Sequence, residues 1–278
     1  MIVPWLPPGH MAHLPGRGEM FYRHHRHGDA SAPTLLLLHG WTASADLQFF
    51  TAYEALAEHY SFVAVDHRGH GRGIRAHGKF ELTDAADDAA ALVQQLGVGP
   101  VVTIGYSMGG PISMLLAQRN PDLVHAMVLQ ATALEWRSTR RERAKWKTVH
   151  IIGPLLRSAA YPRSLRWGIR RLLGRNHSLL QYVPWIANEL RRNDALAVVH
   201  AGQSLSRYDA RPWASSLGKP AACLVTTRDR LVKPRKQRAL ADALNAHVIE
   251  LPDDHLAAWT SPDAFAKATV ELVRSVAS

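Results

Sequence analysis

The chain has 278 residues, 47% of them hydrophobic, and a formal net charge of +10. This is enough for one α/β domain with an insertion, and no apolar run approaches the ~18–20 residues that span a bilayer. Residues 1–18 lack the cationic-then-apolar order of a secretory signal, and a single cysteine, Cys223, excludes an internal disulfide. We therefore expect a cytoplasmic protein.

The first predicted strand covers residues 18–23 and leads to a cluster of histidines at positions 24, 25 and 27. No cysteine or carboxylate set at ligand spacing accompanies this cluster, so we interpret it as a solvated loop or hairpin. We predict no metal and no cofactor.

The next predicted strand, residues 34–38, is apolar or β-branched throughout, as in a buried parallel strand, and it ends in His39-Gly40-Trp41. A His-Gly corner at this point would turn the backbone N–H of Trp41 back across the edge of the sheet. The strand at residues 62–65 ends in Asp66, and we interpret residues 66–73 as a structural loop whose glycines provide turns. These glycines do not match a dinucleotide-binding fingerprint, because no helix starts inside them.

Residues 105–109 read Gly-Tyr-Ser-Met-Gly after the apolar run 101–104, and a helical segment follows to Arg119. This G-x-S-x-G spacing predicts a nucleophile elbow, in which Gly105 and Gly109 allow a strand and a helix to approach closely around an exposed Ser107. We expect the backbone N–H groups of Met108 and Trp41 to form an oxyanion hole beside it.

The excess charge lies in residues 135–211, which hold 16 Lys or Arg against 5 Asp or Glu. Prolines and glycines at 153–154, 162, 174 and 184 divide this segment into several predicted short helices. Within residues 164–174, Leu165, Ile169, Leu172 and Leu173 recur at helical spacing, with arginines and Trp167 between them. Either this apolar stripe packs on the core while the arginines meet water, or the basic helix rests on an anionic membrane at the inner face of the cell.

Five tryptophans in or beside the basic segment would suit a large apolar acyl pocket: Trp136, Trp146, Trp167, Trp185 and Trp213. No recognised nucleic-acid-binding motif accompanies the charge, so we expect no nucleic-acid partner.

The HGW, DHRGHG and GYSMGG motifs at 39–41, 66–71 and 105–110, followed by a late Asp and His, resemble the α/β-hydrolase superfamily over nearly the whole chain. The resemblance implies an eight-stranded, mostly parallel sheet flanked by helices, with a Ser-His-acid triad at the carboxyl ends of its strands. It also implies a core of residues 1–134 and 212–278, with residues 135–211 as an inserted helical lid, or cap.

On the family's template, Asp229 is the triad acid, because it follows the apolar strand 221–227, and His255 is the base, because it follows the strand 247–251. Arg228 and Arg230 beside Asp229 would also suit a structural salt bridge. The family usually has a glycine before the catalytic histidine, and Asp254 stands there in this chain.

We therefore predict a serine hydrolase that cleaves small-molecule carboxylic esters with an apolar or lipid-like acyl group through an acyl-enzyme. His39 and Gly40 would support the oxyanion hole. Thioesterase, lactonase, carbon-carbon hydrolase and acyltransferase chemistry remain alternatives, as does a non-catalytic ligand-binding or scaffold protein on the same fold.

Overall fold

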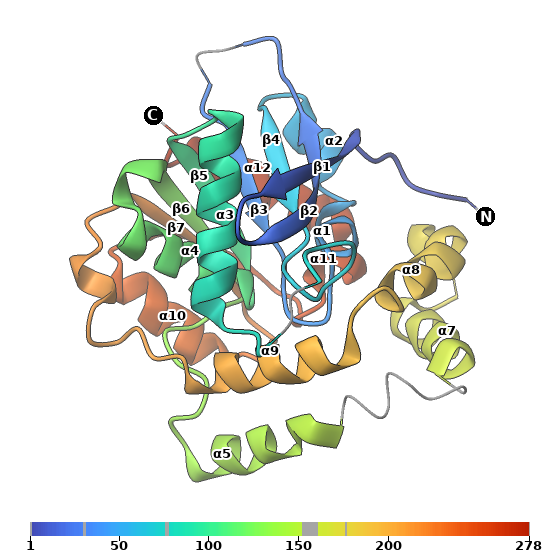
Figure 1. The fold of residues 1–278 in the computed structure, drawn as a ribbon. Helices are drawn as coiled ribbons and strands as arrows, with labels where there is room; N and C mark the ends of the chain where they lie inside the picture. The colour runs from blue at the N-terminus through green and yellow to red at the C-terminus, as the bar shows by residue number, and fades with distance from the viewer. Residues whose placement is uncertain (1, 30–31, 76–77, 152–160, 176, 278) are drawn as a thin grey trace.

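Eight strands form a single sheet in the order β1-β2-β4-β3-β5-β6-β7-β8 (Figure 1). In the computed structural model, which describes residues 2–29, 32–75, 78–151, 161–175 and 177–277, β2 is antiparallel to β1 and β4 and the other neighbours are parallel. The strands are β1 (Gly9–Leu14), β2 (Gly18–His25), β3 (Leu35–Leu38), β4 (Phe62–Val65), β5 (Val101–Tyr106), β6 (Val124–Gln130), β7 (Ala221–Thr226) and β8 (His247–Leu251). The eight-stranded, mostly parallel sheet is confirmed.

The position of the first strand was wrong, because β1 precedes the strand that begins at Gly18. β1 is an edge strand that pairs with β2 alone, and most of its side chains are exposed, so it carries little hydrophobic signal. Of the two interpretations of the histidine cluster, the hairpin is correct for His24 and His25, which lie in β2 of the antiparallel β1–β2 hairpin.

The central strands bury both faces of the sheet. In β3, Leu36 and Leu38 pack into one core cluster while Leu35 and Leu37 pack into the other, as the alternation of side chains along a strand requires. A strand buried on both faces is continuously apolar, which is why sequence analysis located β3, β4 and β5 closely.

Helices cover both faces. Buried residues of α3 (Leu82–Leu96), α4 (Gly109–Arg119) and α10 (Pro234–Ala243) belong to the first cluster, and α3 and α4 lie in front of the sheet in Figure 1. The second cluster contains residues of α1 (Ala45–Phe49), α2 (Tyr53–Ala57), α11 (Ala257–Thr260) and α12 (Pro262–Arg274). The carboxyl ends of the parallel strands therefore open between two helical layers.

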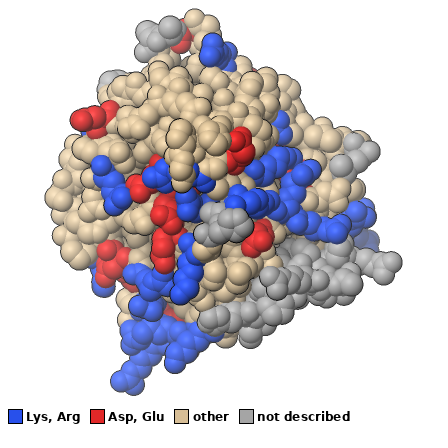
Figure 2. Space-filling view, viewed as in Figure 1, with Lys and Arg blue, Asp and Glu red and all other residues tan. Residues whose placement is uncertain are grey.

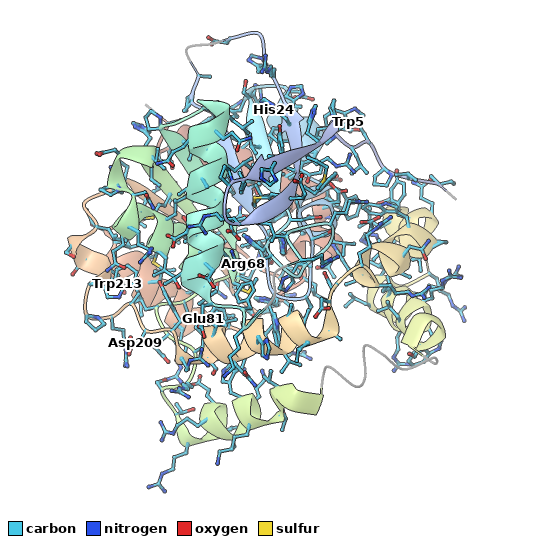
Figure 3. The ribbon with its side chains drawn as sticks, in the orientation of Figure 1. Trp5, His24, Arg68, Glu81, Asp209 and Trp213 are labelled. Carbon is cyan, nitrogen blue, oxygen red and sulfur yellow. The ribbon has the colours of Figure 1, made fainter. Side chains whose placement is uncertain are left out.

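The chain between β6 and β7 holds α5 (Arg140–Lys147), α7 (Tyr161–Leu173), α8 (Val183–Leu190) and α9 (Ala195–Arg207). α9 and α5 run side by side below the sheet in Figure 1. An isolated β-bridge joins Glu135 to Asp209 where this segment leaves and rejoins the core. Glu81, labelled in Figure 3, accepts hydrogen bonds from Ser204 and Arg207 of α9, which fixes α9 to the start of α3.

Pro162 and Pro184 lie in the first turns of α7 and α8, so they begin helices instead of breaking them. Gly174, with φ +78°, follows the end of α7, as expected. The break predicted at residues 153–154 lies outside the described residues.

Most of the predicted apolar stripe of α7 packs inward: Ile169 and Leu173 are buried in the second core cluster and Leu165 packs against it, whereas Leu172 is 42% exposed. Its other side is exposed, and Trp167, 65% exposed, lies there with the guanidinium of Arg171 over its ring. Most basic side chains of α5 are also exposed, and Figure 2 shows them projecting at the lower left of the molecule. No described helix is both long and apolar enough to cross a membrane.

Candidate active site

Ser107 lies on a strained turn between β5 and α4. Its φ of +52° places a residue with a side chain in the left-handed region, which is uncommon outside glycine. A Cβ on Gly105 would overlap the carbonyl oxygen of Gly109, and a Cβ on Gly109 would overlap the carbonyl oxygen of Leu38. The two glycines of the motif are therefore required because backbone meets backbone at both positions.

The neighbouring strand holds the backbone of this turn. The N–H of Ser107 donates to the carbonyl of Gln130 at 2.8 Å, and the hydroxyl of Thr132 donates to the carbonyl of Ser107 at 2.7 Å. These two hydrogen bonds stabilise a conformation that would otherwise relax.

The three side chains expected to form the triad meet at the carboxyl end of the sheet. Ser107 Oγ lies 3.0 Å from His255 Nε2, and His255 Nδ1 lies 2.7 Å from Asp229 Oδ2. Ser107 is 5% exposed and Asp229 is 2% exposed. The arrangement can transfer a proton from the hydroxyl to an imidazole whose other nitrogen is held by a carboxylate.

The carboxylate of Asp229 is held by a dense set of donors. Burial raises its pKa, but the hydrogen bond from His255 and those from the surrounding donors outweigh burial and leave its pKa below the ordinary value. Besides the imidazole, the donors are the N–H groups of Leu231 (2.7 Å) and Val232 (2.8 Å), the Thr226 hydroxyl (2.9 Å) and the Gln237 amide (3.1 Å). Asp229 is therefore a fixed, ionised acceptor for the Nδ1 hydrogen of His255.

The structural alternative for Asp229, a salt bridge to a flanking arginine, is not formed among the described residues. Arg230 lies near Asp254 instead, with 3.7 Å between Nε and Oδ2. Asp254 Oδ1 accepts the N–H groups of Arg230 (2.9 Å) and His255 (2.7 Å), and the Tyr106 hydroxyl donates to the carbonyl of His255 at 2.7 Å. Asp254, which replaces the expected glycine, thus links the loop after β7 that holds Asp229 to the loop after β8 that holds His255.

The corner at residues 39–41 lies directly against the nucleophile. A Cβ built on Gly40 would lie 3.3 Å from Ser107 Cβ. His39 Nδ1 bonds the carbonyl of Gly40 at 2.8 Å, and its Nε2 accepts the N–H of His67 at 3.0 Å. Burial lowers the pKa of His39 well below its ordinary value, so its imidazole is neutral and stabilises the 39–41 corner through these two hydrogen bonds.

The backbone N–H groups of Trp41 and Met108 have no hydrogen-bond acceptor within the described part of the chain. Buried backbone donors are nearly always paired, and Met108 is fully buried. Two unpaired donors at the nucleophile suit an incoming oxyanion.

The chain between β6 and β7 supports the 39–41 corner, which was not predicted. The Trp41 indole Nε1 donates to the carbonyl of Val198 in α9 at 2.7 Å, and its ring lies 5.7 Å from that of Trp146. The Asn193 amide donates to the carbonyl of Thr42 at 2.7 Å and accepts the N–H of Gly71 at 2.8 Å. Nothing near Trp41 in the sequence signals these partners, since they lie more than a hundred residues away.

The loop after β4 is structural, as expected: Asp66 accepts the N–H groups of Ala45 and Arg72, both at 2.8 Å. The guanidinium of Arg68 binds Asp88 of α3 at 2.6 Å, which ties the loop to that helix.

The cavity at Ser107 has a volume of about 90 Å³, which is small. Its walls include Trp41, Leu47, Leu190, Leu256 and Trp259. None of the five tryptophans predicted to form a large acyl pocket lines it among the described residues, so that prediction was wrong. These tryptophans pack against other residues; the ring of Trp185, for example, lies edge-on to that of Phe50.

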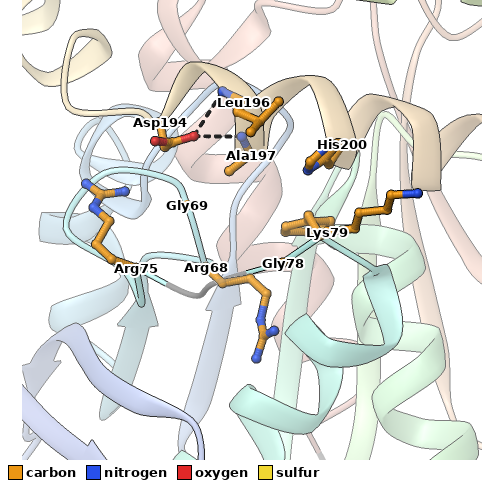
Figure 4. A pocket seen from close by; sticks show the side chains of 10 residues that line it. Arg68, Gly69, Arg75, Gly78, Lys79, Asp194, Leu196, Ala197 and His200 are labelled. Carbon is orange, nitrogen blue, oxygen red and sulfur yellow. Dashed lines mark hydrogen bonds between the residues drawn. The ribbon is translucent and has the colours of Figure 1, made fainter.

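A larger cavity, about 360 Å³, lies between the loop after β4 and the first turns of α9 (Figure 4). Figure 4 shows Asp194 at the start of α9, where its carboxylate accepts the N–H groups of Leu196 and Ala197. The guanidinium of Arg75 at its edge bonds the carbonyls of Gly71 and Arg192. No triad side chain lines this cavity, so volume alone does not locate the chemistry. No group of three or more His, Cys, Asp or Glu suited to a metal occurs among the described residues.

A strained serine, an imidazole and a carboxylate at the carboxyl ends of a mostly parallel sheet define the class of α/β-hydrolase folds. A sequence model of the alpha/beta hydrolase fold family matches residues 33–262 of this chain. The chain therefore belongs to the α/β-hydrolase family, and we describe it as a hydrolase on that ground.

Its relatives differ in their substrates. A provisionally named carbamate hydrolase of Agrobacterium fabrum is 27% identical over 88% of this chain and 95% of its own length. The 2-(acetamidomethylene)succinate hydrolase of Mesorhizobium japonicum is 35% identical, but the match spans only 35% of either chain. The crystal structure of an enol-lactonase from Burkholderia xenovorans superposes with a TM-score of 0.79 at 22% identity, covering 95% of this chain and all of that one. This last likeness concerns the fold alone.

Proposed function

We propose that this protein is a serine hydrolase that cleaves carboxylic esters through Ser107, His255 and Asp229. Asp229 accepts the Nδ1 hydrogen of His255, which leaves the lone pair of Nε2 facing the Ser107 hydroxyl. As Ser107 Oγ attacks the ester carbonyl, Nε2 takes its proton and Asp229 stabilises the imidazolium. The imidazolium then protonates the departing alcohol, and an acyl-enzyme remains.

Water completes the cycle. Nε2 of His255 removes a proton from the attacking water, the second tetrahedral intermediate collapses, and Ser107 recovers the proton as the carboxylic acid leaves. In both intermediates the oxyanion would accept hydrogen bonds from the N–H groups of Trp41 and Met108. Loss of one such donor typically costs about 100- to 1,000-fold in rate.

The observation that carries this proposal is the pair of contacts at 3.0 Å and 2.7 Å that joins Ser107, His255 and Asp229. The size of the cavity bears on the substrate. A cavity of about 90 Å³ suits a short acyl group, so we propose a short-chain ester in place of the lipid-like one.

Labelling with a fluorophosphonate tests the nucleophile and its base. We expect the reagent to modify Ser107 in the wild-type protein, to spare Ser107→Ala, and to react far more slowly with His255→Ala. Equal labelling of wild type and His255→Ala would exclude His255 as the base.

A panel of p-nitrophenyl esters from acetate to palmitate tests the reaction. We expect the highest kcat/KM for acetate to butyrate and a steep decline beyond them. Labelling of Ser107 without hydrolysis of any ester would point to another acyl substrate on the same triad, and absence of labelling would favour a binding or scaffold role.

A further inference from the structure

Gln48 is a buried polar side chain that the proposed reaction does not use. It lies in α1, is 9% exposed and lines the cavity at Ser107. Its backbone N–H donates to the carbonyl of Ser44. Its side-chain amide forms no hydrogen bond within the described part of the chain, yet its atoms are not among the fully enclosed polar atoms that lack a partner, so the amide faces the open cavity. A ligand that fills the cavity displaces water from this amide, and it binds best when it replaces the lost hydrogen bonds.

The other polar groups around this cavity are mostly engaged. The Tyr106 hydroxyl donates to the carbonyl of His255 at 2.7 Å, and the Trp259 indole donates to the carbonyl of Leu47 at 2.8 Å. The Trp41 indole is bound to α9. The Thr42 hydroxyl also lacks a partner among the described residues, but Thr42 is only half-buried.

The amide lies beside the reacting centre. The point that a Cβ on Gly40 would occupy is 3.2 Å from Gln48 Oε1 and 3.3 Å from Ser107 Cβ. In the tetrahedral intermediate the oxyanion faces the N–H groups of Trp41 and Met108, and the leaving oxygen must lie at His255 Nε2 to be protonated. The acyl chain takes the remaining direction, into the cavity whose wall includes Gln48.

We propose that Gln48 is a substrate-binding residue whose amide hydrogen-bonds an uncharged polar group on the β-carbon of the acyl chain. An amide both donates and accepts, so a hydroxyl, a carbonyl or a second amide would satisfy it. No Lys or Arg is found among the described residues that line the cavity, and an ionised acyl group would therefore lack a counter-charge. The inference rests on the proposed role of Ser107 as nucleophile, and it narrows the substrate to esters of short β-hydroxy, β-oxo or β-amido acids.

A matched pair of covalent reagents tests this without requiring turnover. In p-nitrophenyl ethyl propylphosphonate and its 2-hydroxypropyl counterpart, phosphorus replaces the ester carbonyl carbon, and the two differ by one hydroxyl on the carbon that corresponds to the β-carbon. Ser107 Oγ forms a bond to phosphorus and displaces p-nitrophenolate. The rate constant for labelling is followed by release of p-nitrophenolate and by intact mass.

We expect the wild-type protein to react with the hydroxylated reagent about 10- to 100-fold faster, because the plain reagent leaves the amide unpaired. In Gln48→Met, which keeps the length of the side chain and removes the amide, the ratio should fall to near one. Leu47→Met, a similar packing change at the neighbouring wall residue, should keep the wild-type ratio. A purely structural role for Gln48 would slow both reagents together and leave the ratio unchanged.

A wild-type ratio near one, or the same ratio in Gln48→Met, would overturn the assignment of Gln48. Failure of both reagents to label Ser107 would overturn the nucleophile and this inference with it. A preserved ratio together with no hydrolysis of phenyl butyrate or phenyl 3-hydroxybutyrate would support Gln48 while rejecting ester hydrolysis.

Discussion

Replacing Asp229 by asparagine should reverse the tautomer of His255 while leaving the fold in place. Asp229 Oδ1 faces the backbone N–H groups of Leu231 and Val232, which cannot reorient, so the asparagine oxygen must take that position. Its NH₂ group then faces His255 Nδ1, where the native carboxylate accepts a hydrogen at 2.7 Å. The imidazole can satisfy that NH₂ group only by giving up its Nδ1 hydrogen.

The proton then resides on Nε2, where it opposes transfer from Ser107. A triad with the wrong tautomer loses about 10⁴-fold in kcat, equivalent to about 5 kcal/mol of transition-state stabilisation. The new NH₂ group also faces the Gln237 amide, which donates to the native carboxylate at 3.1 Å. We therefore expect a loss of about 1–3 kcal/mol in the free energy of unfolding, which leaves the protein folded at 25 °C.

The assay compares kcat on p-nitrophenyl acetate with thermal unfolding of the same preparation. Asp254→Asn is the matched control, because one oxygen of Asp254 accepts the N–H groups of both Arg230 and His255, and an asparagine oxygen can keep both bonds. We expect that control to stay within about tenfold of wild type. Asp229→Asn activity within tenfold of wild type, or equal losses in the two variants, would refute the role given to Asp229.

Three further measurements probe other parts of the molecule. Gly105→Ala should lower the free energy of unfolding by at least about 3 kcal/mol in urea titrations, because its Cβ would meet backbone atoms that cannot move aside; near-native stability would contradict this. Burial lowers the pKa of His67 to about 3 and of His70 to about 4. Below pH 6.5 these histidines are therefore protonated in the unfolded chain but remain neutral in the folded chain. The free energy of unfolding should fall on acidification from pH 6.5 towards 4, by up to about 1.4 kcal/mol per pH unit for each histidine. Asp66, whose pKa burial raises to about 6, gains a proton in the folded state and offsets at most one of the two histidines, so the net stability should still fall on acidification. A flat pH profile would contradict the burial of both histidines. Finally, we expect the exposed basic face of α7 to bind anionic but not neutral vesicles, less strongly in high salt and after Trp167→Ala; sedimentation that ignores lipid charge would rule out a membrane role.

The parts of this site that could be predicted from sequence are those in which neighbouring residues impose the geometry. Gly105, Ser107 and Gly109 are close in the chain, and the turn they make depends on local backbone sterics, so five letters predict it. His255 and Asp229 were located only by the order of the family's motifs. Their meeting requires β7 and β8 to end at the same edge of the sheet as β5.

Residues that distant packing brings to the site were not predicted. Gln48 is an ordinary polar residue in an apolar run, and only the approach of α1 to Gly40 makes it a wall of the cavity. Asn193 and the carbonyl of Val198 support the 39–41 corner from more than 150 residues away. The prediction that five tryptophans line the acyl pocket was wrong for the same reason: composition predicts apolar surface but not the direction in which each ring points.

The amino-acid sequence by itself determined the class of fold, the strained elbow and the concentration of positive charge between β6 and β7, because hydrophobic periodicity, glycine sterics and formal charge are local properties. Only the tertiary structure decided the small volume of the cavity, the exposure of Arg166, Arg170 and Arg171, and the position of Gln48 on the cavity wall. Those features depend on which surfaces remain uncovered once helices and sheet have packed, and no short stretch of the chain carries that information.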